Sequence, residues 1–263
     1  MKLLSIHRYP VKSMGGSALA HAMVGALGIQ GDRRFMLLDA EGRFVTARER
    51  PHLLLWRAAW MDETQVELIA PDGERHRPIV GDMQVDVRVW DDTFPARLAD
   101  EATTKFLSER FGESLRLVFV EDPSPRAVDP KYGDPDDRVG FADGYPLLLL
   151  SDASHAELVR RVGQPLSIMR FRPNLIVSAG APHAEDDWQQ IRVGTCEFDL
   201  VKPCVRCVLT TVDPETGTPH PDREPLRTLI TYRRGAKGVT FGMNLIPRVF
   251  GTLQVGDPVE VLR

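Results

Sequence analysis

The stretch KPCVRCVLTTVDP, residues 202–214, holds two of the three cysteines of this chain and guides the interpretation of the rest. Cys204 and Cys207 are separated by two residues, and the cations Lys202 and Arg206 stand beside them. A thiolate, not a thiol, binds a metal or acts as a nucleophile, and a nearby cation favours it. The β-branched run after the second cysteine predicts a short strand that ends in a turn. A soft sulfur ligand at a strand end is a suitable position for a metal centre.

The composition indicates a folded protein that does not bind polyanions through its overall charge. The 263 residues carry a net charge of -4, so any anion site must come from local clusters of Arg and Lys. Residues 1–8 turn basic too early for a signal peptide, and no apolar run approaches the roughly 20 residues that span a bilayer. Three cysteines argue against a disulfide framework. We therefore expect a cytoplasmic protein without a nucleic-acid or membrane partner.

The hydrophobic pattern predicts a mainly β protein with a few helices (α+β). Helices are expected at residues 100–111, after Ser151 or Ser154, and at residues 224–232. Cys196 alternates in phase with Phe198, which predicts a buried structural thiol. The predicted strands are residues 3–8, 34–38, 43–46, 53–60, 66–69, 83–89, 115–120, 145–150, 175–178, 208–212, 239–245 and 259–262.

Residues 121–144 interrupt this pattern. They contain four prolines and six aspartates and show little periodicity. An irregular stretch of this length is either a linker or a functional lid. We place a domain boundary just before it, which divides the chain into residues 1–118 and 119–263, and we expect the stretch itself to be a lid.

Two basic clusters could hold a phosphate. Lys12 and Ser13 precede a pair of glycines, and Arg33 and Arg34 stand at the start of a predicted strand. Lysine, arginine and hydroxyl groups beside mobile backbone are the groups that bind phosphate. The residues alone leave open a simpler interpretation, in which the clusters are an exposed turn and a solvated arginine pair.

The residues also leave several roles open for the cysteine pair. A structural zinc would need further ligands, and Cys196, His183 and His220 lack the usual paired spacing. A thioredoxin-like pair would open a helix, which the β-branched residues after Cys207 oppose. Two inert buried thiols are a third possibility. The fourth is a single thiolate on a redox metal, with the nearby cations serving an anionic cofactor.

A set of motifs, taken together, resembles the MOSC family. The motifs are YPVKS at residues 9–13, GDRRF at residues 31–35, FRPN at residues 171–174, and KPCVRC at residues 202–207 followed by TTVDP. They occur in the family's order over nearly the whole chain. More narrowly, the chain is similar to the branch that contains the mitochondrial amidoxime-reducing component and bacterial hydroxylaminopurine-detoxifying proteins. The resemblance implies an N-terminal β-barrel domain packed on a C-terminal MOSC β-barrel domain.

The resemblance also implies a molybdenum cofactor, whose pterin carries a phosphate and a dithiolene. By motif position, Cys207 matches the molybdenum ligand, and Asp213 is expected to assist catalysis as a supporting or proton-relay group. Gly144 and Tyr145 fall at a contacting loop but differ in side chain from the family, so the resemblance carries over only backbone contacts there. The positions that match cofactor contacts are Lys12, Ser13, Arg34, Gly144, Tyr145, Arg172, Asn174 and Arg206.

The expected activity is reduction of N-oxygenated compounds such as N-hydroxylated purines, hydroxylamines and amidoximes. Some family members carry a ferredoxin-like domain, whose [2Fe–2S] cluster needs four cysteines; this chain shows no such set after its last predicted strand. We therefore expect no iron–sulfur cluster in this chain and a separate electron donor, such as a ferredoxin, a flavodoxin or a flavoprotein reductase. The alternatives are a non-catalytic cofactor-binding protein or a sulfur carrier that uses a cysteine persulfide. Pyridoxal phosphate ranks below these, because no lysine is marked for a Schiff base.

Overall fold

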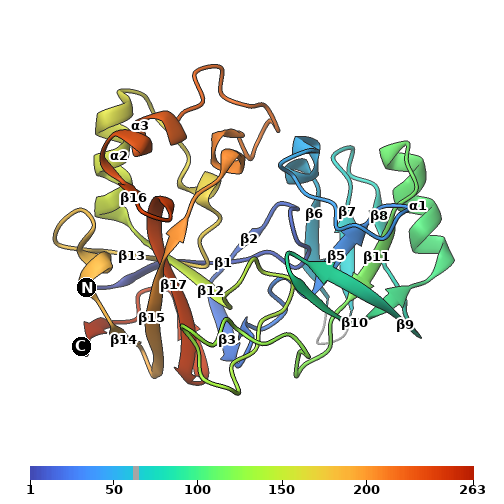
Figure 1. Ribbon diagram of the computed structural model, residues 1–263, viewed down its shortest axis with the longest axis horizontal. Helices are drawn as coiled ribbons and strands as arrows, with labels where there is room; N and C mark the ends of the chain where they lie inside the picture. Colours follow the sequence, from blue (N-terminus) through green and yellow to red (C-terminus); the bar gives the residue numbers. More distant parts are fainter. Residues whose placement is uncertain (62–64) are drawn as a thin grey trace.

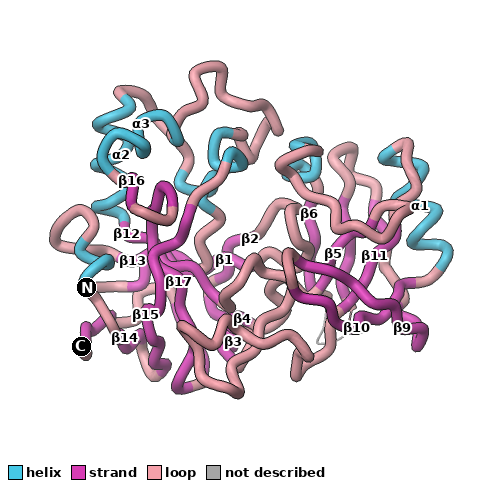
Figure 2. The backbone as a smooth tube through the Cα atoms, in the orientation of Figure 1, coloured by secondary structure: helices cyan, strands magenta, loops and turns pink. Residues whose placement is uncertain are grey.

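The computed structural model describes residues 1–61 and 65–263 and consists of two lobes that lie side by side (Figure 1). The large lobe combines residues 1–29 with the strands and helices that follow residue 146, and the small lobe contains residues 35–119. Strands dominate both lobes, and short helices lie at their edges (Figure 2). The prediction of a mainly β fold with a few helices is confirmed.

The large lobe is built on one extended sheet. Its strands are β1 (Leu3–Arg8), β2 (Ser17–Leu19), β12 (Leu147–Ser151), β13 (Leu175–Val177), β14 (Gln190–Val193), β15 (Cys196–Val205), β16 (Arg234–Gly235), β17 (Gly238–Val249) and β19 (Val259–Val261). They follow the order β19-β14-β15-β17-β12-β13-β1-β2, and β16 pairs with β17. The pairing of β12 with β13 is parallel, and the other pairings are antiparallel.

The beginning of the chain is therefore part of the large lobe. β1 pairs with β13, and β3 (His21–Gly25) pairs with β18 (Gly251–Gln254) and with β4 (Gly28–Ile29) in a second, three-stranded sheet. The division at residues 118 and 119 stays a prediction, but in space the two segments that it separates share both of these sheets.

The core of the large lobe explains its strand pattern. All five residues of β12 are buried, because one face packs in the main core and the other packs toward the helices. The sequence of a strand that is covered on both faces is a continuous apolar run. Cys196 is fully buried in the same cluster as Phe198, so its predicted burial is confirmed.

The small lobe contains two antiparallel sheets. One has the order β5-β11-β10-β9, and the other has the order β6-β7-β8. Their strands are β5 (Phe35–Leu38), β6 (Arg57–Trp60), β7 (Val66–Ile69), β8 (Arg75–His76), β9 (Val80–Val89), β10 (Asp92–Ala99) and β11 (Arg116–Phe119).

The α-helices of the described residues are α1 (Glu101–Phe111), α2 (Asp152–Val162) and α3 (Leu226–Tyr232). Ser151 caps α2 by accepting a hydrogen bond from the Ser154 amide, so of the two predicted start positions, Ser151 and Ser154, the first is confirmed. Gly112 and Gly163 end α1 and α2 in the left-handed conformation, as glycine does at helix ends. Among the described residues, no helix has the length and apolarity needed to cross a membrane.

Some predicted strands take other forms. Residues 208–212 do not form a strand, because Val208–Thr211 is a 3₁₀ helix. The Thr210 hydroxyl donates to the Cys207 carbonyl at 3.0 Å, and the Thr211 hydroxyl donates to the Val208 carbonyl at 2.8 Å. Such bonds from short side chains to the local backbone compete with strand pairing. Residues 43–46 make only isolated bridges, and the first half of residues 53–60 lies in the 3₁₀ helix Pro51–Leu55.

A buried arginine within the irregular segment 121–144 helps to hold it in place. Arg126 is 4 % exposed. Its guanidinium donates to the carbonyls of Gly140, Ala142 and Asp143 and to the Asp92 carboxylate. The C-terminal end of the segment is thereby fixed as a wall between the lobes, and movement of the segment as a lid stays a prediction.

Candidate cofactor-binding site

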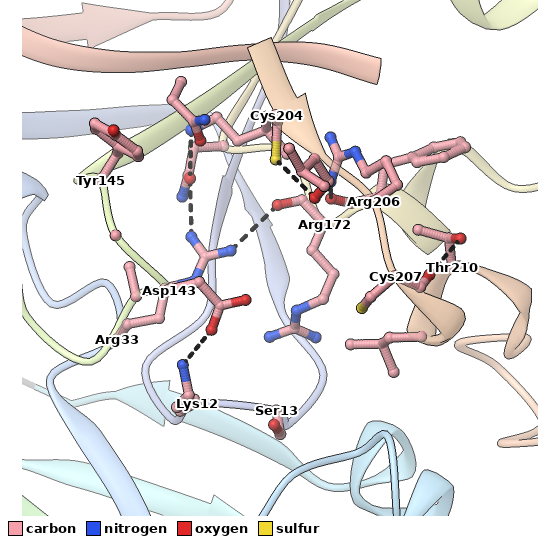
Figure 3. A pocket seen from close by; sticks show the side chains of 18 of the residues that line it. Lys12, Ser13, Arg33, Asp143, Tyr145, Arg172, Cys204, Arg206, Cys207 and Thr210 are labelled. Carbon is pink, nitrogen blue, oxygen red and sulfur yellow. Dashed lines mark hydrogen bonds and ion pairs between the residues drawn. The ribbon is translucent and has the colours of Figure 1, made fainter. Parts of the chain in front are cut away.

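A cavity of about 150 Å³ lies where the two lobes meet (Figure 3). Beside it lies a side groove of about 920 Å³, which shares the wall formed by residues 143–145, Cys204, Val205 and Asn244. The turn between β1 and β2 contributes Lys12 and Ser13 to the central cavity, and the segment that enters the small lobe and the small lobe itself contribute Arg33, Thr46 and Arg48. The large lobe contributes the FRPN turn, the end of β15 with Cys204, and Arg206 and Cys207 just after that strand. The cavity is therefore built from segments far apart in the sequence.

The lining of the central cavity is strongly cationic. Six cations and one carboxylate, Asp143, line it among the described residues. This concentration stands out in a chain with a net charge of -4. Because charges of one sign in a cleft with low-dielectric walls attract the opposite charge, the cavity is suited to an anionic ligand. The cations are Lys12, Arg33, Arg48, Arg170, Arg172 and Arg206.

Asp143 joins two of these cations across the lobe boundary. Lys12 Nζ lies 2.5 Å from one carboxylate oxygen, and Arg48 Nη2 lies 3.0 Å from the other. Lys12 is 6 % exposed and also donates to the Phe141 carbonyl. Desolvation would raise the pKa of Asp143, but the two cations outweigh it and hold that pKa well below the usual range of a carboxyl. The carboxylate therefore stays charged and fixes both cations at the cavity.

The backbone is strained where it approaches the cavity. Ser13, Arg33 and Arg172 have positive φ angles of 72°, 45° and 54°. A residue other than glycine in this region loses about 1–3 kcal/mol, and such residues cluster at functional sites. Arg33 also donates to the Asn174 side chain at 2.8 Å and to the Arg172 carbonyl at 3.2 Å. The two turns are thus tied together at the cavity.

Three buried polar atoms of the lining lack a partner among the described residues. They are Arg172 Nη2, Arg170 Nε and Tyr145 Oη. Buried polar groups in proteins are nearly always hydrogen-bonded, so such atoms need an explanation. Burial, followed by repulsion from Arg33, lowers the pKa of Arg172 to about 10. A bound anion would relieve both effects, and a phosphorylated pterin supplies the required negative charge and hydrogen-bond acceptors.

Cys204 and Cys207, which are both half-buried, differ in their surroundings. Cys207 directly precedes the 3₁₀ helix, and its Sγ accepts a hydrogen bond from Arg48 Nε at 3.3 Å. Cys204 also lines the cavity, but burial raises the pKa of its thiol. The described residues contain no group of three or more His, Cys, Asp or Glu side chains placed to hold a metal ion. A metal at Cys207 would therefore need ligands from a cofactor, as a dithiolene provides.

The structure brings most of the predicted site residues together. The eight that line the central cavity are Lys12, Ser13, Gly144, Tyr145, Arg172, Asn174, Arg206 and Cys207. Figure 3 shows Arg172 reaching toward the centre of the space and Cys207 on its wall. These positions agree with the predicted site, while their individual roles stay predictions.

Two predicted residues lie outside the cavity lining. The Arg34 guanidinium donates to the Val120 carbonyl and packs on Phe119, away from the cavity. Its neighbour Arg33 takes the inward position because its left-handed backbone turns the chain there. Asp213 lies behind the lining, where its carboxylate accepts a hydrogen bond from Arg170 at 2.8 Å. It therefore positions a lining arginine and does not reach the cavity.

Two of the residues predicted to contact the cofactor make most of their side-chain hydrogen bonds to other parts of the protein. The Asn174 amide accepts from Arg33 and from the Leu148 amide and donates to the His7 carbonyl. Arg206 donates to the carbonyls of Phe241 and Phe171. Both residues shape the cavity, and their hydrogen bonds explain their rigidity.

Five lining residues with charged or amide side chains are absent from the predicted cofactor contacts. Three of them, Arg33, Asp143 and Arg170, directly precede a predicted contact or motif. The other two lie in segments whose local pattern does not predict a site. The five residues are Arg33, Arg48, Asp143, Arg170 and Asn244.

Comparison with known proteins identifies the family. Residues 1–114 match the MOSC N-terminal beta barrel domain, and residues 136–260 match the MOSC domain. The chain is 34% identical to mitochondrial amidoxime-reducing component 1 of Homo sapiens, over 97% of this chain and 81% of that protein. It is 32% identical to the same component of Xenopus laevis, over 95% of this chain and 79% of that protein.

A solved structure is similar at lower identity. The YUAD protein from Bacillus subtilis is 14% identical, with a TM-score of 0.46, over 98% of this chain and 93% of that one. The sequence matches, which span nearly the whole chain, confirm the resemblance noted from the motifs. This protein belongs to the MOSC family.

Proposed function

We propose that this protein is a molybdenum-cofactor-dependent reductase of N-oxygenated compounds. The observation that carries the proposal is the cation-lined cavity with the Cys207 thiol in its wall. A deep anion site beside a single soft ligand suits a cofactor that brings both a phosphate and its own sulfur ligands for the metal. The names of the similar proteins, amidoxime-reducing components, support the same reaction class.

The residues that would hold the cofactor follow from the lining. Lys12, Ser13, Arg33 and Arg172 would bind the phosphate and the pterin, with Arg33 in the role predicted for Arg34. Cys207 would be the protein ligand of the metal. When bound, the cofactor supplies two-electron chemistry that, with two protons, converts an N–OH group to N–H and releases water.

The surrounding residues would keep this arrangement rigid. Asn174 and Arg206 hold the turns through backbone bonds, and Asp213 holds Arg170. We assign Asp213 this positioning role in place of a proton relay, because it does not line the cavity.

The remaining parts of the proposal concern the partners. Candidate substrates are N-hydroxylated purines, hydroxylamines and amidoximes, which would enter through the side groove. The electrons would come from a separate protein, such as a ferredoxin, a flavodoxin or a flavoprotein reductase. We also propose the cytoplasm as the location of this chain.

A second candidate function is sulfur transfer without turnover of its own. It is favoured by one observation, namely that both Cys204 and Cys207 line the same cavity. This function predicts a persulfide on one of the two cysteines and no stoichiometric molybdenum.

The test is metal and pterin analysis of protein from a host able to make molybdenum cofactor. The parent is compared with Cys207→Ser and with Cys196→Ser, a matched control whose thiol lies in the core. We expect near-stoichiometric molybdenum and pterin in the parent and in the control, and loss or altered coordination of the metal in Cys207→Ser. Reduction of an amidoxime by the loaded parent, driven by a chemical reductant, would support the activity. If the folded parent contains no molybdenum, the proposal is refuted. Mass spectrometry of the cysteines would then show whether Cys204 or Cys207 carries a persulfide.

A further inference from the structure

Arg48 crosses from the small lobe to the cysteine of the large lobe. Its Nε lies 3.3 Å from Cys207 Sγ, and its Nη2 lies 3.0 Å from the Asp143 carboxylate. The guanidinium is a planar fork whose donors point in fixed directions, so one side chain can serve both acceptors at once. With 22% of its side chain exposed, Arg48 is partly shielded from solvent.

The position of this guanidinium is fixed from several sides. It stacks on the Trp90 ring, with its central carbon 4.7 Å from the ring centre. Trp90 in turn packs edge-on against Phe44 at 5.4 Å. The Arg48 amide donates to the Thr46 hydroxyl at 3.2 Å, which orders the loop that carries it. Stacking and ion pairing together leave the Nε–H aimed at the sulfur.

The other nearby cations are engaged elsewhere. Arg206, directly before Cys207, bonds to backbone carbonyls, and Arg170 is paired with Asp213. Among the described residues, Arg48 is the side chain that donates to Cys207 Sγ. The side-chain hydrogen bond to this sulfur therefore comes from the opposite lobe.

We propose that Arg48 positions and polarises the Cys207 sulfur, and thereby tunes the redox properties of the metal it would bind. This inference rests on the proposed function. A hydrogen bond from a cation withdraws electron density from a coordinating sulfur, and hydrogen bonds to ligand sulfurs are known to set reduction potentials. Arg48 thus acts through Cys207 and is a positioning residue.

The experiment compares Arg48→Leu and Arg48→Lys with a matched control, Arg50→Leu. Arg50 belongs to the same loop but pairs with Glu113, outside the cavity. Each protein is loaded with cofactor, and the midpoint potential of its molybdenum couple is measured by a redox titration followed by electron paramagnetic resonance. We expect a lower potential in Arg48→Leu, a smaller fall in Arg48→Lys, and a turnover number reduced about tenfold in Arg48→Leu. The control should match the parent.

The outcomes separate this inference from the proposed function. A parent without molybdenum refutes the proposed function and the inference with it. A loaded parent and a loaded Arg48→Leu protein with the same potential and the same spectrum overturn the inference alone. If Arg48→Leu retains too little metal for a titration, Arg48→Lys decides: a lowered potential supports the inference and an unchanged one overturns it.

Discussion

Replacing Asn174 by alanine is predicted to destabilise the fold, because the side-chain amide of Asn174 makes three hydrogen bonds within the protein. Asn174 is fully buried, and its side-chain oxygen accepts from Arg33 at 2.8 Å and from the Leu148 amide at 3.1 Å. Its side-chain nitrogen donates to the His7 carbonyl at 3.1 Å. Each buried group left unpaired destabilises a protein by about 1–3 kcal/mol, and Arg33 keeps other partners. We therefore expect a total loss of about 2–4 kcal/mol in Asn174→Ala.

Thermal unfolding of the cofactor-free protein measures this loss. For a chain of this size it corresponds to a fall in melting temperature on the order of 10 °C. The matched control is Asn244→Ala, a half-buried lining residue whose amide donates to the Lys202 carbonyl. One such bond contributes about 0.5–1.5 kcal/mol, so the control should melt close to the parent. If Asn174→Ala also melts within about 2 °C of the parent, the hydrogen-bond argument is refuted.

Three further predictions concern the walls of the cavity. Lys12 and Arg48 hold the pKa of Asp143 low, so the Asp143 carboxylate stabilises the fold above about pH 4, and this stabilisation is lost as the pH falls further. In urea unfolding, the difference in free energy of unfolding between the parent and Asp143→Asn should therefore become smaller from about pH 6 to about pH 3. Gly242→Ala would place a Cβ 2.6 Å from a backbone oxygen, whereas Gly256→Ala, also at positive φ, meets open space; the first should lower the urea midpoint well beyond the second. Arg126→Met removes the bonds that hold residues 121–144, so limited proteolysis should cut that segment faster than in the parent.

Much of the site could be predicted because its residues lie in short motifs. Lys12, Arg172 and Cys207 each stand in a stretch whose chemistry is visible in the sequence, and the cavity joins them. Arg48 and Asp143 could not be found in this way. Their importance comes from contacts across the lobe boundary, which leave no local periodicity in either segment.

The differences between the predicted and the observed positions of single residues and elements have local causes. The choice between Arg33 and Arg34 depended on a left-handed turn at Arg33, which decides which side chain faces inward. The run after Cys207 has β-branched residues, but its threonine hydroxyls return to the backbone and close a 3₁₀ helix. Strand propensity reflects packing on a sheet surface, and among the described residues this run belongs to no sheet and makes only the isolated bridge from Val212 to Pro219.

The pairing of β1 with β13 and of β3 with β18 has a consequence for how the protein is made. These strands leave the ribosome early, yet their partners follow much later in synthesis. Until then β1 and β3 present unpaired edges, which in nascent chains are sites of aggregation. Long-range pairing of this kind also slows folding. We therefore expect the two segments matched by the family models to complete their folding together.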